Sequence, residues 1–449
     1  MNAGNDSINP GESTHLQLPV NGMVVTHKSF IALSTVILVL LVVLGPGYDQ
    51  KKTKLVDAYG YEFAMQNFAL GKWLLSDTDI EMRLADEEHM TPQRIMYVSP
   101  ADGKWVFRKS PGYPLLSIPF QRLGWPRATN ATLLVLASGA LYFALRAWRG
   151  ERFALLGFLV FLFTPMTLRA AYFSTMDTFA AGALPIIAVS FLLYYWSSAG
   201  ERSGAWLVMG VAGLAAGWSV VVRIHSLPIL VLLVLFVILK MQPYIGEDNG
   251  RSARAGLAFF MGLAIALAVL LIYNQAVFGR PLATGYAFDS PYQELFLWES
   301  NTLTELGGRQ LWHVNASPQS FIATIIEHLA AWMVPLLRGW PLLPLAFAAL
   351  VLAAVQRRLS AVHWLSLLWL AATYALYAGI VYFGITFELT IPYFRGEGFF
   401  AVDRYLFPAS LPIALLTALF LARLRSELQM LVLIVFISVS LISYGHFVL

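Results

Sequence analysis

The chain contains no cysteine among its 449 residues, and only 12% of its side chains are charged. The lack of cysteine excludes disulfide bonds, thiolate metal sites and a cysteine nucleophile. Soluble domains are usually about 25% charged and about 45–50% apolar. This chain is 58% hydrophobic, with a mean hydropathy of +0.65. The composition therefore predicts a polytopic membrane protein.

Motifs for soluble nucleotide chemistry are also lacking. We find no P-loop, no glycine-rich dinucleotide turn and no nucleophile elbow, and no cytoplasmic segment long enough to bind a nucleotide. An enzyme of this kind would need a donor that is already activated and delivered in the membrane. The net charge of +4 does not indicate nucleic-acid binding, because such an excess in a membrane protein usually lies at cytoplasmic loop ends.

Apolar segments divide the chain into a polar tail, residues 1–29, predicted to be cytoplasmic, and one transmembrane domain, residues 30–449. Each span needs roughly 20 apolar residues. We interpret Phe30–Leu44 as a signal anchor and the first span. Further spans are expected near 129–145, 153–168, 178–196, 206–222, 226–240, 255–273, 340–355, 362–386, 405–421 and 428–447. The predicted fold is all-α, with about eleven transmembrane helices and a large first extracytoplasmic loop that carries amphipathic interfacial helices.

Basic residues predict the orientation. Connectors on one side of the membrane carry Arg146, Arg149, Arg152, Arg202, Lys240, Arg251, Arg254, Arg357, Arg358, Arg423 and Arg425. The positive-inside rule makes this side cytoplasmic and places segments 47–128, 274–339 and 387–404 outside. Lys51, Lys52 and Lys54 oppose this assignment locally, but long loops translocate largely regardless of their charge. We expect Phe321–Leu337 to form an outer-surface or re-entrant helix.

Asp57 is the first candidate for chemistry. It precedes a segment in which Phe63, Phe68, Leu70 and Trp73 could face lipid while Glu62, Gln66 and Asn67 face water. Such a helix would lie along the membrane surface. The carboxylate could simply cap the helix; alternatively, it could act as a general base at the height of lipid head groups.

Asp177 is the second candidate. It could cap the span that begins at Thr178, although acidic residues at membrane depth are expensive and usually functional. With Asp57 it could bracket a divalent cation or an acceptor. Cationic candidates on the same side either snorkel to head groups or bind a lipid phosphate; they are Arg108, Lys109, Arg223, Arg338 and Arg404.

Several motifs together resemble the GT-C glycosyltransferases, which include protein O-mannosyltransferases and the aminoarabinose transferase of lipid A. Asp57 heads an Asp-x-Tyr-x-Tyr-x-x-Ala helix that closes on Gly71-Lys72-Trp73. The remaining motifs follow in the family's order: Lys109-Ser-Pro-Gly-Tyr-Pro-Leu-Leu116, Asp177, Tyr273-Asn-Gln-Ala-Val-Phe-Gly-Arg-Pro-Leu-Ala-Thr-Gly-Tyr286 and Asp403-Arg-Tyr-Leu-Phe-Pro408. Two departures stand out, because Val56 and Ala58 flank Asp57 without a second acid and Ser110 replaces the first proline of a Pro-Pro pair.

The resemblance implies inverting transfer of a sugar from a polyprenyl-phosphate carrier to an envelope glycan, lipid or exported protein. By the same resemblance, Asp57 is the base, Lys109 and Arg404 bind the donor phosphate, and Asp177 positions the acceptor or an optional Mg²⁺ or Mn²⁺. It implies a bacterial inner-membrane protein that contacts membrane lipids and whose site faces the periplasm.

Two other classes remain open. A transporter or flippase of lipid-linked sugars should show an internal repeat, and none is visible. A polymerase or ligase of the O-antigen type would be expected to carry its main outer loop late in the chain, whereas here it comes first.

Overall fold

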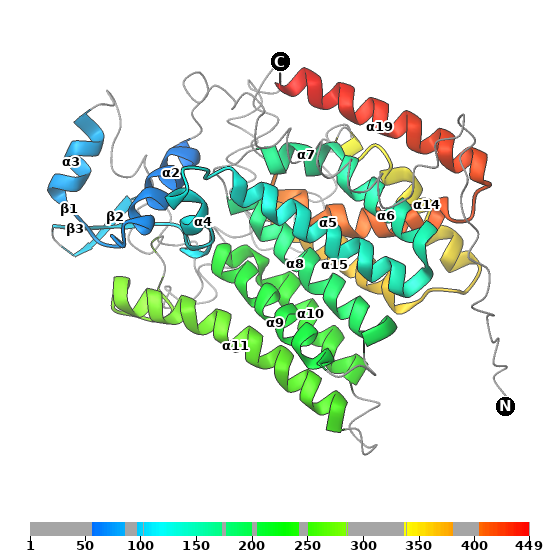
Figure 1. The fold of residues 1–449 in the computed structure, drawn as a ribbon, viewed down its shortest axis with the longest axis horizontal. Coiled ribbons are helices and arrows are strands. Elements are labelled where there is room, and N and C mark those ends of the chain that lie inside the picture. The colour runs from blue at the N-terminus through cyan, green and yellow to red at the C-terminus, as the bar shows by residue number, and fades with distance from the viewer. Residues whose placement is uncertain are drawn as a thin grey trace, which may run out of the picture.

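The computed structural model describes residues 56–85, 97–101, 103–172, 177–199, 204–241, 250–283, 285, 336–337, 339–379 and 404–448. The polar tail, the expected first span, and most of the 321–337 and 387–404 segments lie outside these residues. The described part is mostly helical, with one small sheet (Figure 1).

A bundle of apolar helices makes up most of the molecule. Its helices are α5 (Ala128–Arg149), α6 (Glu151–Phe163), α7 (Pro165–Tyr172), α8 (Asp177–Tyr194), α9 (Ala205–Val222), α10 (Leu227–Met241), α11 (Gly250–Phe278), α14 (Leu343–Val355), α15 (Ala361–Gly379), α18 (Ser410–Leu421) and α19 (Ser426–Val448). Short helical segments among the described residues adjoin them: η1 (Tyr195–Ala199), η2 (Ile224–Ser226) and η7 (Arg404–Ala409).

The eleven predicted spans are not confirmed. Five described helices are long and apolar enough to cross a membrane, or six if α6 and α7, which are bent by 58°, count as one span. The bend falls at Thr164, which is extended, because Pro165 cannot donate the backbone hydrogen bond that would continue α6 and disfavours a helical conformation in the residue before it. Other expected spans coincide with shorter apolar helices, among them α14 and α15. The protein is an integral membrane protein with several spans.

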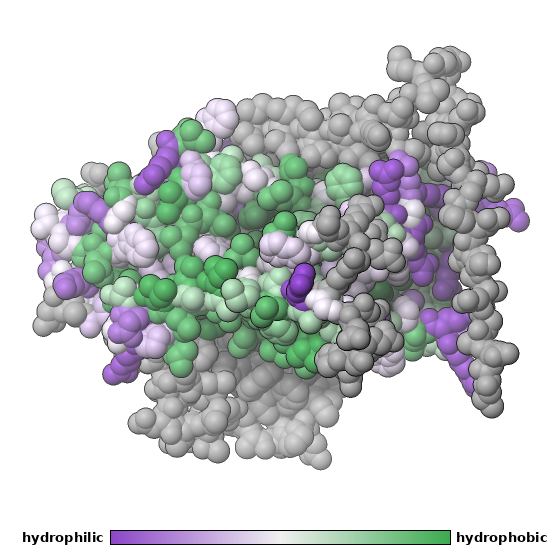
Figure 2. Space-filling view, turned by 60° about the horizontal axis from the view of Figure 1, so that its bottom comes forward, coloured by the Kyte–Doolittle hydropathy of each residue, from purple (hydrophilic) through white to green (hydrophobic). Residues whose placement is uncertain are grey.

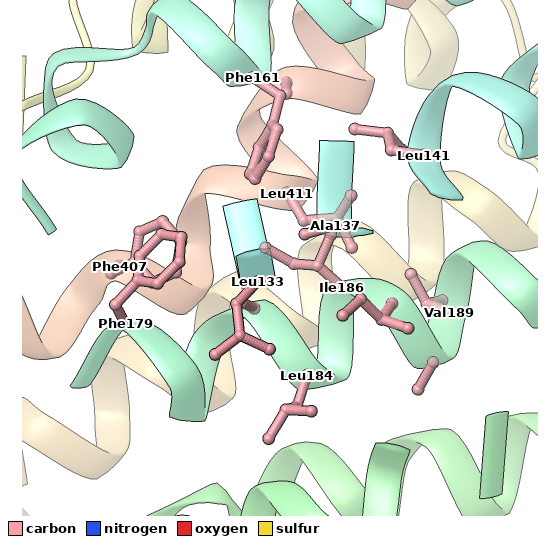
Figure 3. Close-up of a cluster of buried hydrophobic side chains, with 14 of the residues drawn as sticks. Leu133, Ala137, Leu141, Phe161, Phe179, Leu184, Ile186, Val189, Phe407 and Leu411 are labelled. Atoms are coloured by element: carbon pink, nitrogen blue, oxygen red, sulfur yellow. The ribbon is translucent and has the colours of Figure 1, made fainter. Parts of the chain in front are cut away.

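The core lies where α5, α6, α8 and α18 meet. Figure 3 shows side chains of these helices pointing toward one another; they include Leu133, Ala137, Phe161, Ile186 and Leu411. α8 is apolar all round and buried on nearly all sides, as expected for a central helix. α11 instead exposes Leu257, Ile265 and Ile272. Figure 2 shows a broad hydrophobic band with most hydrophilic residues toward the two ends of the long axis, which fits an outer surface in lipid.

A compact module covers one end of the bundle. It consists of α2 (Val56–Ala69), β1 (Leu75–Ser76), α3 (Asp77–Ala85), β2 (Tyr97–Ala101), β3 (Lys104–Phe107) and α4 (Gly112–Arg122). The strands are antiparallel in the order β1-β3-β2. Ser76 and Asp79 cap α3 reciprocally, because the Asp79 carboxylate accepts from Ser76 N–H at 3.0 Å and Ser76 Oγ accepts from Asp79 N–H at 3.2 Å. The all-α expectation is therefore wrong for this module.

The prediction of a lipid-facing side is wrong for Phe63 and Phe68. Leu70 and Trp73, which were also predicted to face lipid, are exposed. Phe63 packs on Tyr97 and Phe68 packs on Tyr273, and both phenylalanines are buried. Asn67 is buried too and donates to the Phe63 carbonyl at 2.9 Å. The sheet, α4 and α11 supply the apolar surface against which these two phenylalanines pack.

The chain runs back and forth between two ends of the bundle. The end covered by α2–α4 is called the loop end, and the end carrying Arg149, Arg357 and Arg423 is called the arginine end. α5 begins at the loop end, where Asn130 contacts Tyr113 of α4, and finishes at Arg149. Its 22 residues separate the two ends by about 33 Å, at 1.5 Å per residue.

Candidate functional site

The turn between β3 and α4 is fixed against the end of α9. Phe107, the last residue of β3, is fully buried and packs on Tyr61 and Tyr97. Gly112 opens α4 so close to α9 that a Cβ there would overlap the backbone of Val221 and Val222. The Trp218 indole also donates to the Gly112 carbonyl at 3.3 Å. The intervening residues, Arg108–Pro111, are thereby held beside the end of α9.

Three basic residues, Lys109, Arg223 and His225, gather at this junction. Arg223 ends α9 in an extended conformation and is followed by His225 in η2. Arg223 and Lys109 both lie close enough to the His225 ring to interact with it electrostatically. Arg108, next to Lys109, is only 6% exposed. Buried cationic side chains are stable only when they are paired or hydrogen-bonded.

A carboxylate pairs with Arg223 at this junction. Asp177, the first residue of α8, accepts from Arg223 Nη1 at 3.3 Å, and their side chains are 10% and 13% exposed. The Tyr113 hydroxyl donates to Asn130 Oδ1 at 3.2 Å. Burial raises the pKa of Tyr113, and the nearby Asp177 carboxylate raises it further. The first turns of α4, α5 and α8 therefore converge with the end of α9.

A small cavity of about 10 Å³ opens beside this cluster. Its wall includes Thr178, Arg223, His225, Thr373 and Pro408. Arg223 and His225 therefore border the space between α8, α15 and η7.

Asp57 lies in the first turn of α2, and its side chain is outside the described residues. The helix begins one residue earlier, so Asp57 is inside the first turn and not at the N-cap. Tyr61 follows one turn later and packs edge-on against Tyr113, with ring centroids 5.7 Å apart. Because residues i and i+4 share a helix face, the backbone of residue 57 lies on the side of α2 that contacts α4.

Arg404 begins η7, and its side chain is also outside the described residues. Phe407 of η7 stacks on Phe179 of α8, with ring centroids 4.9 Å apart. Phe179 is two residues after Asp177, so η7 lies beside the first turn of α8. The backbone of Arg404 is therefore at the loop end. Lys109 and Asp177 also lie there, linked through His225 and Arg223.

Sequence reasoning missed His225, Tyr113 and Asn130. The available signal was the Arg223-Ile-His225 run directly after an apolar helix, because ionisable residues at membrane depth are rare and usually functional. Tyr113 lies within the Lys109–Leu116 motif, in which only the lysine was assigned a role, and Asn130 carries no such signal.

The described residues do not fit a divalent cation. No group of three His, Asp or Glu side chains suited to a metal occurs among them. Asp177 is instead paired with Arg223. The role predicted for Asp177 toward an acceptor or metal stays a prediction, because the Asp57 side chain and residues 173–176 are not described.

No protein-family model and no curated protein matches the chain. Solved structures do match it. ArnT from Cupriavidus metallidurans, bound to undecaprenyl phosphate, aligns with a TM-score of 0.54 and 17% identity over 90% of this chain and 63% of that one.

The archaeal oligosaccharyltransferase AglB from Archaeoglobus fulgidus aligns in two forms. The complex with an inhibitory peptide and a dolichol-phosphate gives a TM-score of 0.53 and 13% identity over 93% of this chain and 54% of that one. The complex with Zn and sulfate gives a TM-score of 0.53 and 14% identity over 92% and 52%. The chain therefore spans between about half and 63% of the length of these proteins. At these identities the likeness is one of fold, and the chain shares that fold with these proteins over 90% or more of its length.

Proposed function

We propose that this chain is a membrane glycosyltransferase that transfers a sugar, with inversion, from a polyprenyl-phosphate carrier to an envelope acceptor. The observation that carries the proposal is the gathering of Lys109, Arg223 and His225 at the loop end. Its fold is shared with a structure bound to undecaprenyl phosphate. The proposed location is a bacterial inner membrane, with the loop end facing the periplasm.

The donor phosphate is proposed to bind beside Lys109, at the β3–α4 turn. Lysine and arginine form short, charge-assisted bonds with phosphate oxygens. The N-terminus of α4 begins three residues after Lys109, and helix N-termini also favour anions. Arg404 of η7 would approach from the side of α8. These groups would bind the phosphate in the ground state and more strongly as it gains charge.

In the proposed reaction the Asp57 carboxylate takes the proton of an acceptor hydroxyl. The acceptor oxygen attacks the anomeric carbon as the bond between that carbon and the carrier phosphate oxygen breaks. The polyprenyl phosphate leaves with the bonding electron pair, and the sugar inverts. The cations stabilise the charge that develops on the leaving oxygen.

Asp177 is proposed to position Arg223. Their bond is mostly buried, so it holds the guanidinium in one orientation near His225 and Lys109. The described residues give no ground for a metal-dependent step.

Donor binding can be tested with undecaprenyl phosphate as the probe, titrated into the full-length protein in detergent. We expect Lys109→Ala to weaken binding roughly tenfold, the loss of about one charge-assisted bond. Lys104→Ala is the matched control, because Lys104 is exposed on β3 of the same module. Equal binding by both variants would remove Lys109 from the phosphate site.

Transfer can be tested by mass spectrometry of envelope lipids, glycans and exported proteins from cells that carry or lack the chain. We expect Asp57→Asn to abolish the product while binding of undecaprenyl phosphate persists. Asp49→Asn, the other acid near the start of the loop, should keep the product. A product made at the wild-type level by Asp57→Asn would exclude the general-base role. Movement of the carrier across the membrane without any product would favour a transporter.

A further inference from the structure

A second basic cavity lies at the arginine end of the bundle. It has a volume of about 480 Å³ and opens between three connectors, those joining α5 to α6, α14 to α15 and α18 to α19. Its polar wall is formed by Arg149, Gln356, Arg358, Ser360, His363 and Arg423. The length of α5 separates it from the proposed donor site by about 33 Å, so it is a different site.

The cavity wall is positively charged and unbalanced. None of the described residues that line it is acidic. Arg149 and Arg423 are close enough to interact electrostatically with each other, and both act on His363. Like charges held near one another raise the free energy unless an anion joins them.

Arg149 and Arg423 are both held in place by neighbours that leave guanidinium donors available. Arg149 lies over the Trp148 ring at 4.6 Å and the Phe153 ring at 5.6 Å. Stacking of this kind uses the face of the guanidinium and not its in-plane N–H groups. Arg423 Nη1 donates to Gln356 Oε1 at 3.2 Å, a contact that occupies one of its five donors.

The end of α14 adopts a conformation that normally selects glycine. Arg357 has a φ of +52°. Arg357 N–H donates to the Ala354 carbonyl at 2.9 Å, and Arg358 N–H donates to the Ala353 carbonyl at 2.8 Å. This is a Schellman motif with arginine at the left-handed position. The reversal carries the chain directly into Arg358, which lines the cavity.

The start of α15 adds neutral donors. Ser360 N–H donates to His363 Nδ1 at 3.1 Å, and the Ser360 hydroxyl lies 2.8 Å from the same nitrogen. Because Nδ1 accepts the backbone N–H, the neutral ring carries its proton on Nε2, where it can donate. The first backbone N–H groups of α15 lie at the same place, and a helix N-terminus favours an anion.

We propose that this cavity binds the phosphate group of an anionic phospholipid in the leaflet at the arginine end. The cluster of arginines, the helix N-terminus and the imidazole donor all suit a phosphate. Trp364 and Leu368, one turn apart on α15 next to His363, are about half exposed and offer an apolar surface for acyl chains. By the positive-inside rule this leaflet is cytoplasmic, where anionic lipids concentrate and basic pockets between helices bind their head groups.

The test uses the full-length protein in mixed micelles of a neutral detergent with phosphatidylglycerol or phosphatidylcholine. Retained lipid is counted by native mass spectrometry, and the affinity is measured by titration. The variant Arg358→Gln/Arg423→Gln removes two lining charges. Its control, Arg357→Gln/Arg425→Gln, removes the same charge from the same connectors at positions that do not line the cavity.

We expect the wild type and the control to retain one phosphatidylglycerol in preference to phosphatidylcholine. The lining variant should bind it roughly tenfold more weakly or worse, with the difference shrinking as salt rises. Equal losses of phosphatidylglycerol affinity in the two variants would mean that the general positive charge of this surface binds the lipid, and would overturn the proposal. Inorganic phosphate that displaces phosphatidylglycerol at similar concentration would assign the cavity to a soluble phosphate and also overturn it. Unchanged donor binding at the loop end would show that the proposed transferase function is unaffected.

Discussion

At the scale of single residues, the site depends on Arg223. It bonds to Asp177 and lies near His225, with which Lys109 also interacts electrostatically. The sequence marked Arg223 only as one of several cations and Asp177 as a separate acid, because their pairing joins positions 46 residues apart. Asp57 and Lys109 were identifiable because they occur in motifs with a fixed local order. The role of Asp57 remains a prediction.

The first prediction concerns this ion pair. Asp177→Asn leaves Arg223 buried without its carboxylate, which should destabilise the protein by about 3 kcal/mol. Undecaprenyl phosphate should then raise the melting temperature more in Asp177→Asn than in the wild type, because the ligand replaces the missing negative charge and stabilises the folded state by mass action.

A double-mutant cycle with Arg223→Gln checks the pairing. The double variant should be less destabilised than the sum of the two single variants. If the losses of stability in the two single variants simply add, the two side chains do not stabilise each other. If undecaprenyl phosphate raises the melting temperature equally in Asp177→Asn and in the wild type, the ion pair plays no part in phosphate binding.

At the scale of elements, the sequence predicted where apolar helices occur but not which surfaces, lipid or protein, they pack against. Hydrophobic runs located α5, α8, α9 and α11, since lipid and core both require apolar side chains. The same runs could not distinguish lipid from protein, so Phe63 and Phe68 were assigned to the membrane although the sheet, α4 and α11 bury them. β1 and β3 were missed because they are only 2 and 4 residues long, too short for an alternating pattern to show.

The second prediction concerns the contact between α4 and α9. Gly112→Ala places a methyl group where the backbone of Val221 and Val222 lies, so the β3–α4 turn must move away from Arg223. We expect undecaprenyl phosphate to bind at least tenfold more weakly and the melting temperature to fall. Gly139→Ala is the control, because nothing lies within 4 Å of a Cβ at that position in α5 and alanine favours helix by about 1 kcal/mol. Normal lipid affinity in Gly112→Ala would show that this close approach does not position Lys109.

At the scale of the whole molecule, the two ends of the bundle carry different chemistry. The loop end brings together one acid and several basic groups under a small folded module, whereas the arginine end presents a basic cavity between connectors. The number of spans and the side on which each end lies were both inferred from apolar runs and basic connectors. Neither apolar runs nor basic connectors predict how far a helix tilts or bends. The span expected at 153–168, for example, is broken before Pro165 into two helices, α6 and α7.

The third prediction tests the orientation and uses the absence of cysteine. Because the wild-type chain has none, a single introduced cysteine is labelled without background. Lys104 is exposed at the loop end, and Arg425 is exposed at the arginine end. In intact bacterial spheroplasts a membrane-impermeant maleimide should label Lys104→Cys, and it should label Arg425→Cys only after permeabilisation.

Labelling of Arg425→Cys alone in intact spheroplasts would place the candidate site on the cytoplasmic side and rule out an acceptor on the outer face. Labelling of both in intact spheroplasts would place the two ends on one side, which a membrane-spanning α5 does not allow.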